Sequence, residues 1–334
     1  MKKTTVLIVI FLVLFSLFIF NLSASTIESR TVLFDHDGGY DDFLSLIMLL
    51  AMPHIELEGI VITPADCYLE PATSATIKIL RFFKRLDIEV SKGTIHGVNP
   101  FPREWREHAY HVDALPILAD YKYVLPAPVS EPGHEFLARK LRESDKKLTV
   151  LITGPVSNIA SALETNPSLS TKIEEIVWMG GALLVNGNVR EHEHDGSAEW
   201  NAYWDPLSVQ KLWQTDIPIT IVPLDATNHV PVSKEFLKRL AHQSYYSVSD
   251  LAVQIWTKAV GPSYEYLYFM WDTLTTSYLG APQYIIFQNV RTKVTPSGKS
   301  AGRIEINESG RPVKAAFNVD VVGLKSYLLD LFKK

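Results

Sequence analysis

Short apolar runs alternate with longer stretches of helical periodicity along most of the chain. The runs typical of buried strands cover residues 31–34, 57–63, 88–90, 148–153, 173–179 and 219–224. Helical spacing covers residues 43–52, 71–86, 135–143, 205–213, 233–243, 249–260, 272–279 and 322–332, with a further helix after residue 158. Because strands that alternate with helices form βαβ units, the pattern predicts an α/β fold with a mainly parallel central sheet flanked by helices.

Three stretches interrupt this alternation. Residues 93–115 and 121–133 contain several prolines and are predicted to be irregular. The aromatic residues of the first stretch argue against disorder, and a loop of that length in a compact domain is usually functional. Residues 284–317 are predicted to form short β segments with turns. Since no repeat or linker is evident, residues 26–334 are predicted to form a single domain.

The first 25 residues have the pattern of a signal peptide. Lys2 and Lys3 give a positive start, residues 6–20 are almost entirely apolar, and residues 23–25 are small. The apolar run is short for a membrane span, so we expect cleavage and export rather than a stable membrane anchor. The protein is therefore predicted to be secreted, either to a periplasm or to the cell exterior. The alternative is an uncleaved signal anchor.

Composition excludes some partners and one source of stability. The net charge of −5 over 334 residues gives no electrostatic reason to expect a nucleic acid partner. Cys67 is the single cysteine, so no intramolecular disulfide can form. An exported domain of this length must then be stable through its hydrophobic core.

An acidic turn follows the first predicted strand. Asp35, Asp37, Asp41 and Asp42 lie within eight residues, around the pair Gly38-Gly39. Four carboxylates repel one another unless a positive charge lies among them, and oxygen ligands suit a hard divalent cation. The turn is predicted to bind Ca²⁺ through Asp37 and Asp42. The alternative is a surface turn that caps a helix, but four acids exceed what capping requires.

Polar groups follow the other predicted strands as well. Asp66, Thr153, Gly180-Gly181 and Asp225 each stand at the end of a strand. The carboxyl ends of parallel strands meet at one edge of a sheet, which is where ligands bind in open α/β folds. We therefore expect a binding crevice at the C-terminal edge of the sheet.

Several side chains outside the strand ends could contact a ligand or could have a purely structural role. Glu199 and Asn201 could hydrogen-bond a polyol such as a sugar. Asp272 could simply cap a helix, and Trp271 could belong to the core, whereas Trp105 in its proline-rich loop could stack on a flat ligand. The alternating pair His192 and His194 lacks the further ligands of a zinc site, so a solvated loop is predicted there.

The chain resembles the calcium-dependent nucleoside hydrolases of the inosine-uridine type, and within them the purine-specific branch. The resemblance runs collinearly from residue 32 to about residue 279, most of the chain. The matching residues are Asp35-His36-Asp37-Gly38, Asp41-Asp42, Ala65-Asp66-Cys67, Asn99-Pro100-Phe101-Pro102, Glu104-Trp105, Thr153-Gly154-Pro155, Met179-Gly180-Gly181, Gly187-Asn188-Val189, Ala198-Glu199-Trp200-Asn201, Trp204-Asp205-Pro206, Leu224-Asp225 and Trp271-Asp272.

The resemblance implies a Rossmann-like fold and a role for each matched residue. Calcium would be held by Asp37, Asp42, Asp272 and the backbone carbonyl of Thr153, and Asp37 would also be the general base for the attacking water. The residues implied to bind the ribose hydroxyls are Asp41, Asn188, Glu199, Asn201 and Asp272. Trp105 and Trp271 would sandwich a purine, with Asp66 and Glu104 near its edge. The tryptophan at 271, where the non-specific branch has histidine, points to purines.

The implied reaction is hydrolysis of a purine ribonucleoside to free base and ribose. Breaking the C–N glycosidic bond builds positive charge on the sugar, and calcium with a carboxylate makes water a better nucleophile. Two stacked indoles favour an N-protonated purine by cation–π attraction, and the sequence offers no clear protein acid for the leaving group. The chain departs from the branch at Gly39, where relatives often carry Asn, and in a shorter segment 261–270.

Three other functions remain open on the sequence alone. The chain could hydrolyse pyrimidine as well as purine nucleosides, or bind a nucleoside with calcium but without catalysis. A haloacid dehalogenase type phosphotransferase also begins with two acids after a strand, but Gly39 stands where that class carries Thr or Val. The expected partner is a small-molecule nucleoside, and the chain could form a homodimer.

Overall fold

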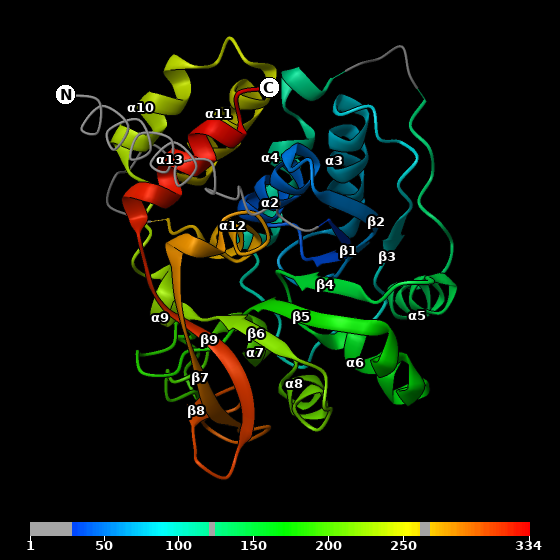
Figure 1. The fold of residues 1–334 in the computed structure, drawn as a ribbon, viewed down its shortest axis with the longest axis vertical. Coiled ribbons are helices and arrows are strands. Elements are labelled where there is room, and N and C mark those ends of the chain that lie inside the picture. The colour runs from blue at the N-terminus through cyan, green and yellow to red at the C-terminus, as the bar shows by residue number, and fades with distance from the viewer. Residues whose placement is uncertain (1–28, 120–123, 261–267) are drawn as a thin grey trace, which may run out of the picture.

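The computed structural model describes residues 29–119, 124–260 and 268–334, and these residues form one nine-stranded sheet with helices on both faces (Figure 1). The strand order is β3-β2-β1-β4-β5-β6-β9-β7-β8. All pairs from β3 to β9 are parallel, whereas β7 pairs antiparallel with both β9 and β8. The strands are β1 (Arg30–His36), β2 (Ile55–Ile62), β3 (Val90–Lys92), β4 (Leu148–Ile152), β5 (Ile173–Met179), β6 (Ile219–Val222), β7 (Ile285–Val294), β8 (Ile304–Ile306) and β9 (Arg311–Val319).

The helices divide between the two faces of the sheet. Figure 1 shows α2, α3 and α12 on one side, and α5, α6 and α8 on the other. The α-helices are α2 (Tyr40–Ala51), α3 (Leu69–Phe82), α4 (His108–Asp113), α5 (Gly133–Glu143), α6 (Ser157–Thr165), α7 (Trp200–Trp204), α8 (Pro206–Trp213), α9 (Leu224–Thr227), α10 (Lys234–His242), α11 (Ser247–Val260), α12 (Trp271–Ser277) and α13 (Val321–Leu331). Short 3₁₀ helices lie at Trp105–Glu107, Pro116–Leu118, Pro167–Lys172 and Pro282–Tyr284.

Alternate residues of the central strands pack into two separate hydrophobic cores, one on each face of the sheet. In β1, Val32 and Phe34 are fully buried with α2, α3 and α12, whereas Leu33 is buried with α5 and α6. Side chains of a strand point alternately to opposite faces, so a strand covered on both faces must be apolar throughout. This is why the strands appear in the sequence as continuous apolar runs.

The predicted α/β fold with a mainly parallel sheet is confirmed, but several elements differ from the prediction. The stretch 93–115 is not wholly irregular, because it contains a 3₁₀ turn and α4. The strand predicted at 88–90 lies at Val90–Lys92, and the predicted short β segments near the C-terminus include two long antiparallel strands, β7 and β9. For the strands, long-range pairing rather than local pattern sets the boundaries.

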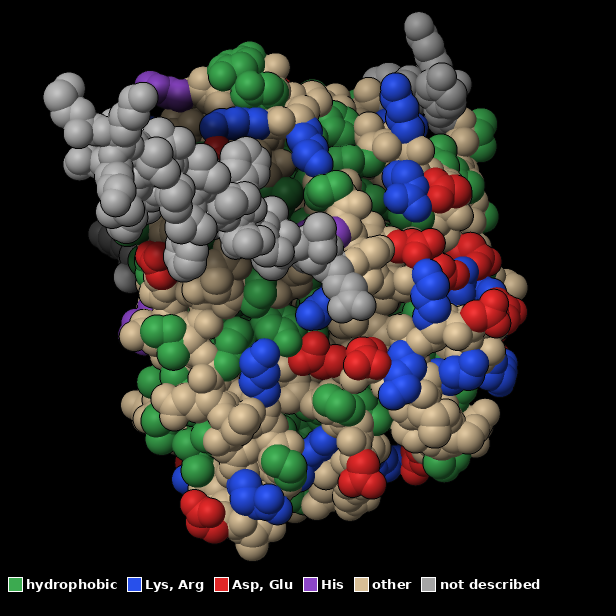
Figure 2. Space-filling view, viewed as in Figure 1, with side chains coloured by type: hydrophobic (Ala, Val, Ile, Leu, Met, Phe, Trp, Pro, Cys, Tyr) green, Lys and Arg blue, Asp and Glu red, His purple; other side chains and the backbone are tan. Residues whose placement is uncertain are grey.

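The predicted signal peptide, residues 1–25, lies outside the described residues, as does most of the segment 261–270. Among the residues that the structure does describe, no helix is long and apolar enough to cross a membrane. Figure 2 shows acidic and basic side chains interspersed over the visible face, without a continuous basic surface.

Candidate active site

A cavity of about 510 Å³ opens at the C-terminal edge of the sheet. This volume is within the usual range for small-molecule sites. Every residue to which the family resemblance assigned a role lines this one cavity: Asp37, Asp41, Asp42, Asp66, Glu104, Trp105, Thr153, Asn188, Glu199, Asn201, Trp271 and Asp272. The structure therefore brings these residues together, while their individual roles remain predictions.

The acidic turn is held by a tight backbone and by hydrogen bonds to distant elements. Gly38 has φ of +82°, and a Cβ there would approach Cys67 Cβ to 2.6 Å, so both conformation and space require glycine. Asp42 Oδ2 accepts from the Gly39 N–H at 2.7 Å, and Oδ1 accepts from the Thr153 hydroxyl on the loop after β4. The turn is thereby fixed to the neighbouring strand end.

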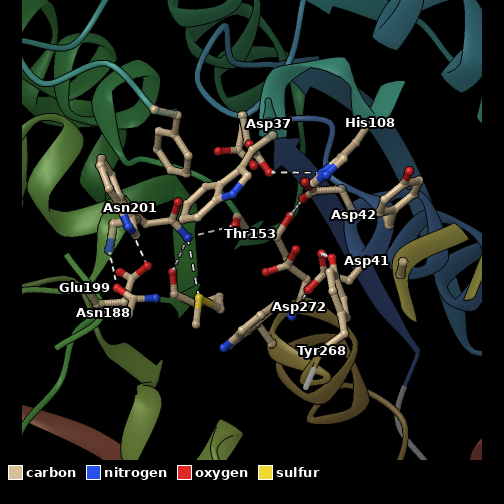
Figure 3. Close-up of a pocket in the computed structure, with 18 of the residues that line it drawn as sticks. Asp37, Asp41, Asp42, His108, Thr153, Asn188, Glu199, Asn201, Tyr268 and Asp272 are labelled. Atoms are coloured by element: carbon tan, nitrogen blue, oxygen red, sulfur yellow. Dashed lines mark hydrogen bonds and ion pairs between the residues drawn. The ribbon is translucent and has the colours of Figure 1, made fainter. Parts of the chain in front are cut away.

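Asp41 connects α2 to the start of α12. Its Oδ1 accepts from the Tyr268 hydroxyl at 2.6 Å, and its Oδ2 accepts from the Asp272 N–H at 3.2 Å. These contacts place the Asp272 carboxyl beside the acidic turn although about 230 residues separate the two segments (Figure 3). Asp272 does begin a helix, as capping would require, but its carboxyl lines the cavity.

The acidic groups of the cavity raise one another's pKa. Burial first, and then the charges of Asp42 and Asp66, raise the pKa of Asp37 well above its ordinary value. Burial and the charge of Asp41 likewise raise the pKa of Asp272 well above its ordinary value. Asp37 Oδ2 is buried without any hydrogen-bond partner. Such a cluster is energetically costly unless a positive charge compensates it.

The donor atoms fit a hard cation by charge and chemistry. Carboxylate oxygens of Asp37, Asp42 and Asp272 and the carbonyl of Thr153 are the oxygen ligands that calcium prefers. Within the described residues, however, no three His, Cys, Asp or Glu side chains already converge as a preformed metal group. The Thr153 carbonyl accepts from Asn201 Nδ2 at 3.0 Å. The site therefore fits a cation by its negative charge and by the unpartnered Oδ2 of Asp37, and not by a preformed set of ligands.

The opposite side of the cavity carries Asn188, Glu199 and Asn201 (Figure 3). Glu199 caps α7, because its carboxylate accepts from the backbone N–H groups of Asn201 at 2.8 Å and Ala202 at 3.3 Å. It also accepts from the Gly181 N–H, on the loop after β5, at 3.1 Å. Burial nevertheless raises the pKa of Glu199 to about 7. Asn188 Oδ1 accepts from the Trp200 N–H at 3.1 Å. This wall is built from polar groups that a ligand with several hydroxyls could contact.

The two cavity tryptophans belong to different aromatic clusters. Trp105 packs edge-on against Phe101 and Trp200, with ring centroids 6.1 and 5.5 Å away. Trp271 packs against Tyr268 at 4.8 Å, and its indole N–H has no hydrogen-bond partner. Both indoles are half-buried and face the cavity. Each indole is thus held by aromatic neighbours on one side and open to a ligand on the side that lines the cavity.

The cavity also contains residues that the sequence reasoning missed. Tyr40, His108, His111, Met179, Lys258 and Tyr268 line it. His108 and His111 lie on α4, a helix that was not predicted because prolines precede it in the sequence. Trp105, His108 and His111 are each three residues apart, which is the spacing of one helix face and could have indicated it. Tyr268 could not have been found, since only the folded chain brings it to Asp41.

Two other predicted residues have supporting positions. Asp225 accepts from the backbone N–H groups of Leu183 and Leu184, both at 2.7 Å, and does not line the cavity. The solvated loop predicted around the two histidines is correct for His192, which is exposed, but wrong for His194, whose side chain is only 2% exposed. His194 bonds the carbonyl of Ala301 through Nε2 at 2.9 Å.

The family model described as inosine-uridine preferring nucleoside hydrolase matches residues 32–326. The chain belongs to this family. A nucleoside hydrolase structure of that type from Bacillus anthracis is 40% identical, has a TM-score of 0.87, and is matched over 91% of this chain and 99% of its own. The family prediction and the fold prediction are thus confirmed.

Other members of the nucleoside hydrolase family differ in base preference. A pyrimidine-specific ribonucleoside hydrolase of Salmonella typhimurium is 32% identical over 212 residues, which are 62% of this chain and 64% of that relative, so less than two thirds of its length is matched. A purine-preferring ribonucleoside hydrolase of Gardnerella vaginalis, at 22% identity and a TM-score of 0.74 over 91% of this chain and 99% of its own, shares the fold. The purine preference therefore remains a prediction.

Proposed function

We propose that this nucleoside hydrolase cleaves the N-glycosidic bond of purine ribonucleosides in a calcium-dependent reaction, releasing free base and ribose. The observation that carries the proposal is the meeting, in one cavity, of a buried acid cluster, a polar wall and two half-buried indoles. A nucleoside has the matching parts: a bond to hydrolyse, a sugar with hydroxyls, and a flat base.

Calcium would be held by Asp37, Asp42, Asp272 and the carbonyl of Thr153. When bound there, it would offset the repulsion among the carboxylates and lower the pKa of a water molecule. Asp37 is the proposed general base, because its Oδ2 is buried and has no other hydrogen-bond partner. The position of Asp42 is fixed by its bonds to Gly39 and Thr153, which suits a ligand rather than a proton acceptor.

In the proposed reaction the oxygen of water bonds to the anomeric carbon of the ribose, and its proton passes to Asp37. The C–N bond breaks and its electron pair remains on the base. Positive charge builds on the sugar as this happens, and the surrounding carboxylates favour that charge. The base then takes a proton from solvent, and Asp37 returns its proton to solvent. Glu199, Asn188 and Asn201 would orient the sugar from the opposite wall.

Purine preference is proposed on the basis of Trp105 and Trp271. An indole on either side of the base would favour a large, flat ring through stacking. The pyrimidine-specific relative gives a specific reason to keep broader specificity as the second candidate. A nucleoside-binding protein without catalysis is the third candidate.

A panel of inosine, guanosine, adenosine, uridine and cytidine, with calcium and with excess chelator, tests the proposal. We expect the purified protein to release hypoxanthine or guanine faster than any pyrimidine, and only with calcium. Asp37→Asn should abolish release, whereas Asp145→Asn, at an exposed site, should not. Equal rates for wild type and Asp37→Asn would refute the hydrolase mechanism, and tight inosine binding without turnover would favour the binding protein.

Export is a separate proposal that rests on residues 1–25. We expect the mature chain to begin after the small residues 23–25. Amino-terminal sequencing of the protein recovered outside the cytoplasm tests this, and an intact Met1 on that protein would contradict cleavage.

A further inference from the structure

Three aromatic side chains on the cavity wall have no role in the reaction as proposed so far. Tyr40, at the start of α2, and His108 and His111, on α4, form what we call the Tyr-His cluster. His108 follows Trp105 by three residues, so both side chains reach the same cavity from one helical segment. The cluster therefore borders the part of the cavity where Trp105 would contact the base.

His108 carries a hydrogen-bonding atom that the protein leaves unused. Its Nδ1 is buried without a partner, and the nearest carboxylate oxygen, Asp66 Oδ2, is 3.9 Å away. That separation exceeds a hydrogen bond. Asp66 Oδ1 is also buried and unpartnered. Buried polar atoms are nearly always satisfied, so two such atoms on one cavity wall indicate a polar ligand between or beside them.

The imidazole ring of His108 is held in a fixed plane. It stacks on Tyr40 with ring centroids 4.3 Å apart and an interplanar angle of 25°. The Tyr40 hydroxyl is itself hydrogen-bonded to His111 Nδ1. A donor that is oriented before the ligand arrives costs little reorganisation during the reaction.

The charge state of His108 also suits this position. Burial, with a smaller effect from His111, lowers the pKa of His108 to about 4, so the ring is neutral at neutral pH. A neutral imidazole still carries one N–H, and it adds no positive charge next to a sugar that is becoming positive. The Tyr268 hydroxyl cannot serve instead, because it donates to Asp41.

We propose that His108 donates a hydrogen bond to the leaving nucleobase, an inference that rests on the nucleoside hydrolase function proposed above. When the C–N bond breaks, its electron pair remains on the base, and the imidazole N–H stabilises the charge that develops there. The base takes its final proton from water after departure, so His108 is unchanged at the end of the cycle. Asp66 accepts from a base N–H on the same edge.

The test compares two leaving groups in the purified protein with calcium. Inosine releases hypoxanthine, whose anion is unstable and needs stabilisation. The riboside p-nitrophenyl β-D-ribofuranoside releases p-nitrophenolate, a stable anion that does not. His108→Phe removes the donor but keeps a ring to stack on Tyr40. We expect it to lower kcat on inosine about 100-fold and to leave hydrolysis of the nitrophenyl riboside close to wild type.

His108→Asn, which retains an N–H donor, should recover part of the activity on inosine. His242→Asn, at an exposed histidine on α10, is the matched control. An equal loss on both substrates, no loss on inosine, or no recovery in His108→Asn would each overturn the proposal. If His108→Phe does not fold, His108→Ala gives the same ratio of rates. Failure of the wild type to cleave either substrate would instead refute the hydrolase function, and the inference with it.

Discussion

Asn201 illustrates how one side chain can support the site and also line its cavity. Its Nδ2 donates to the carbonyls of Thr153 at 3.0 Å and Met179 at 3.1 Å, which follow or end two adjacent strands. The sequence predicted only a contact with a sugar hydroxyl. The structure adds a role in closing the C-terminal edge of the sheet between β4 and β5.

We therefore expect Asn201→Ala to reduce stability as well as sugar binding. The change leaves two buried carbonyls without a side-chain donor, which should lower the free energy of unfolding by about 1–3 kcal/mol. Chemical denaturation measures this, with Asn186→Ala, at an exposed asparagine, as the control. Equal stability of the two variants would show that the bonds of Asn201 contribute nothing net.

Glu199 should make stability depend on pH. Its pKa is raised from 4.5 to about 7 by burial, so the native state binds a proton that the unfolded state has released. Stability must then fall as pH rises from about 4.5 to about 7, and stay low above that range. Glu199→Gln should flatten this slope in denaturation curves recorded with chelator, although it weakens the cap of α7. An unchanged slope would place the titration elsewhere.

At the scale of elements, the antiparallel excursion β7–β8–β9 supports the wall that carries Glu199 and Asn201. The turn between β7 and β8 contacts the loop that precedes α7. His194 is hydrogen-bonded to the carbonyl of Ala301, and the Asp195 N–H donates to the carbonyl of Lys299 at 2.8 Å. Gly302 lies directly against the backbone of Tyr203 in α7. A segment remote from the chemistry thus sets the position of α7.

Gly302→Ala tests this support, and Gly298→Ala is its matched control. Both glycines have positive φ, +85° and +81°, so either alanine costs about 1 kcal/mol of backbone strain. Only at Gly302 would the new Cβ collide with Tyr203, at 2.7 Å, since nothing lies within 4 Å of the Cβ at 298. We expect Gly302→Ala alone to raise KM for the nucleoside. Identical kinetics in both variants would contradict the supporting role.

At the scale of the whole molecule, the site joins segments that are far apart in the chain. Helix α12 packs against α2, and the Asp41 bonds to Tyr268 and Asp272 connect residues that are 227 and 231 positions apart. The buried carboxylates at this junction repel one another. Their charge should make the folded state sensitive to a bound cation.

We expect calcium to raise Tm relative to chelator, because a ligand that binds only the folded state stabilises it. The gain is about 2.7 kcal/mol at a concentration of roughly 100 times Kd. Asp272→Asn should reduce the shift. Sodium chloride at matched ionic strength is the control, and an equal shift with it would indicate screening of charge rather than a specific site.

The sequence alone determined the fold class, the approximate positions of the central strands and the acidic turn at Asp37 and Asp42. These features depend on local periodicity and on residues close together in the chain, so they can be predicted from short windows. The collinear resemblance added distant positions such as Trp271 and Asp272, and the cavity contains them all.

Only the tertiary structure decided which distant groups share a partner. It brought Tyr268 to Asp41, buried His194 against Ala301, and formed α4 with His108 beside the cavity. Such contacts join segments far apart in the chain, and burial, which shifts the pKa of Glu199 and His108, exists only after the segments pack. No local pattern carries that information, because the same side chains in an open chain would be solvated and free.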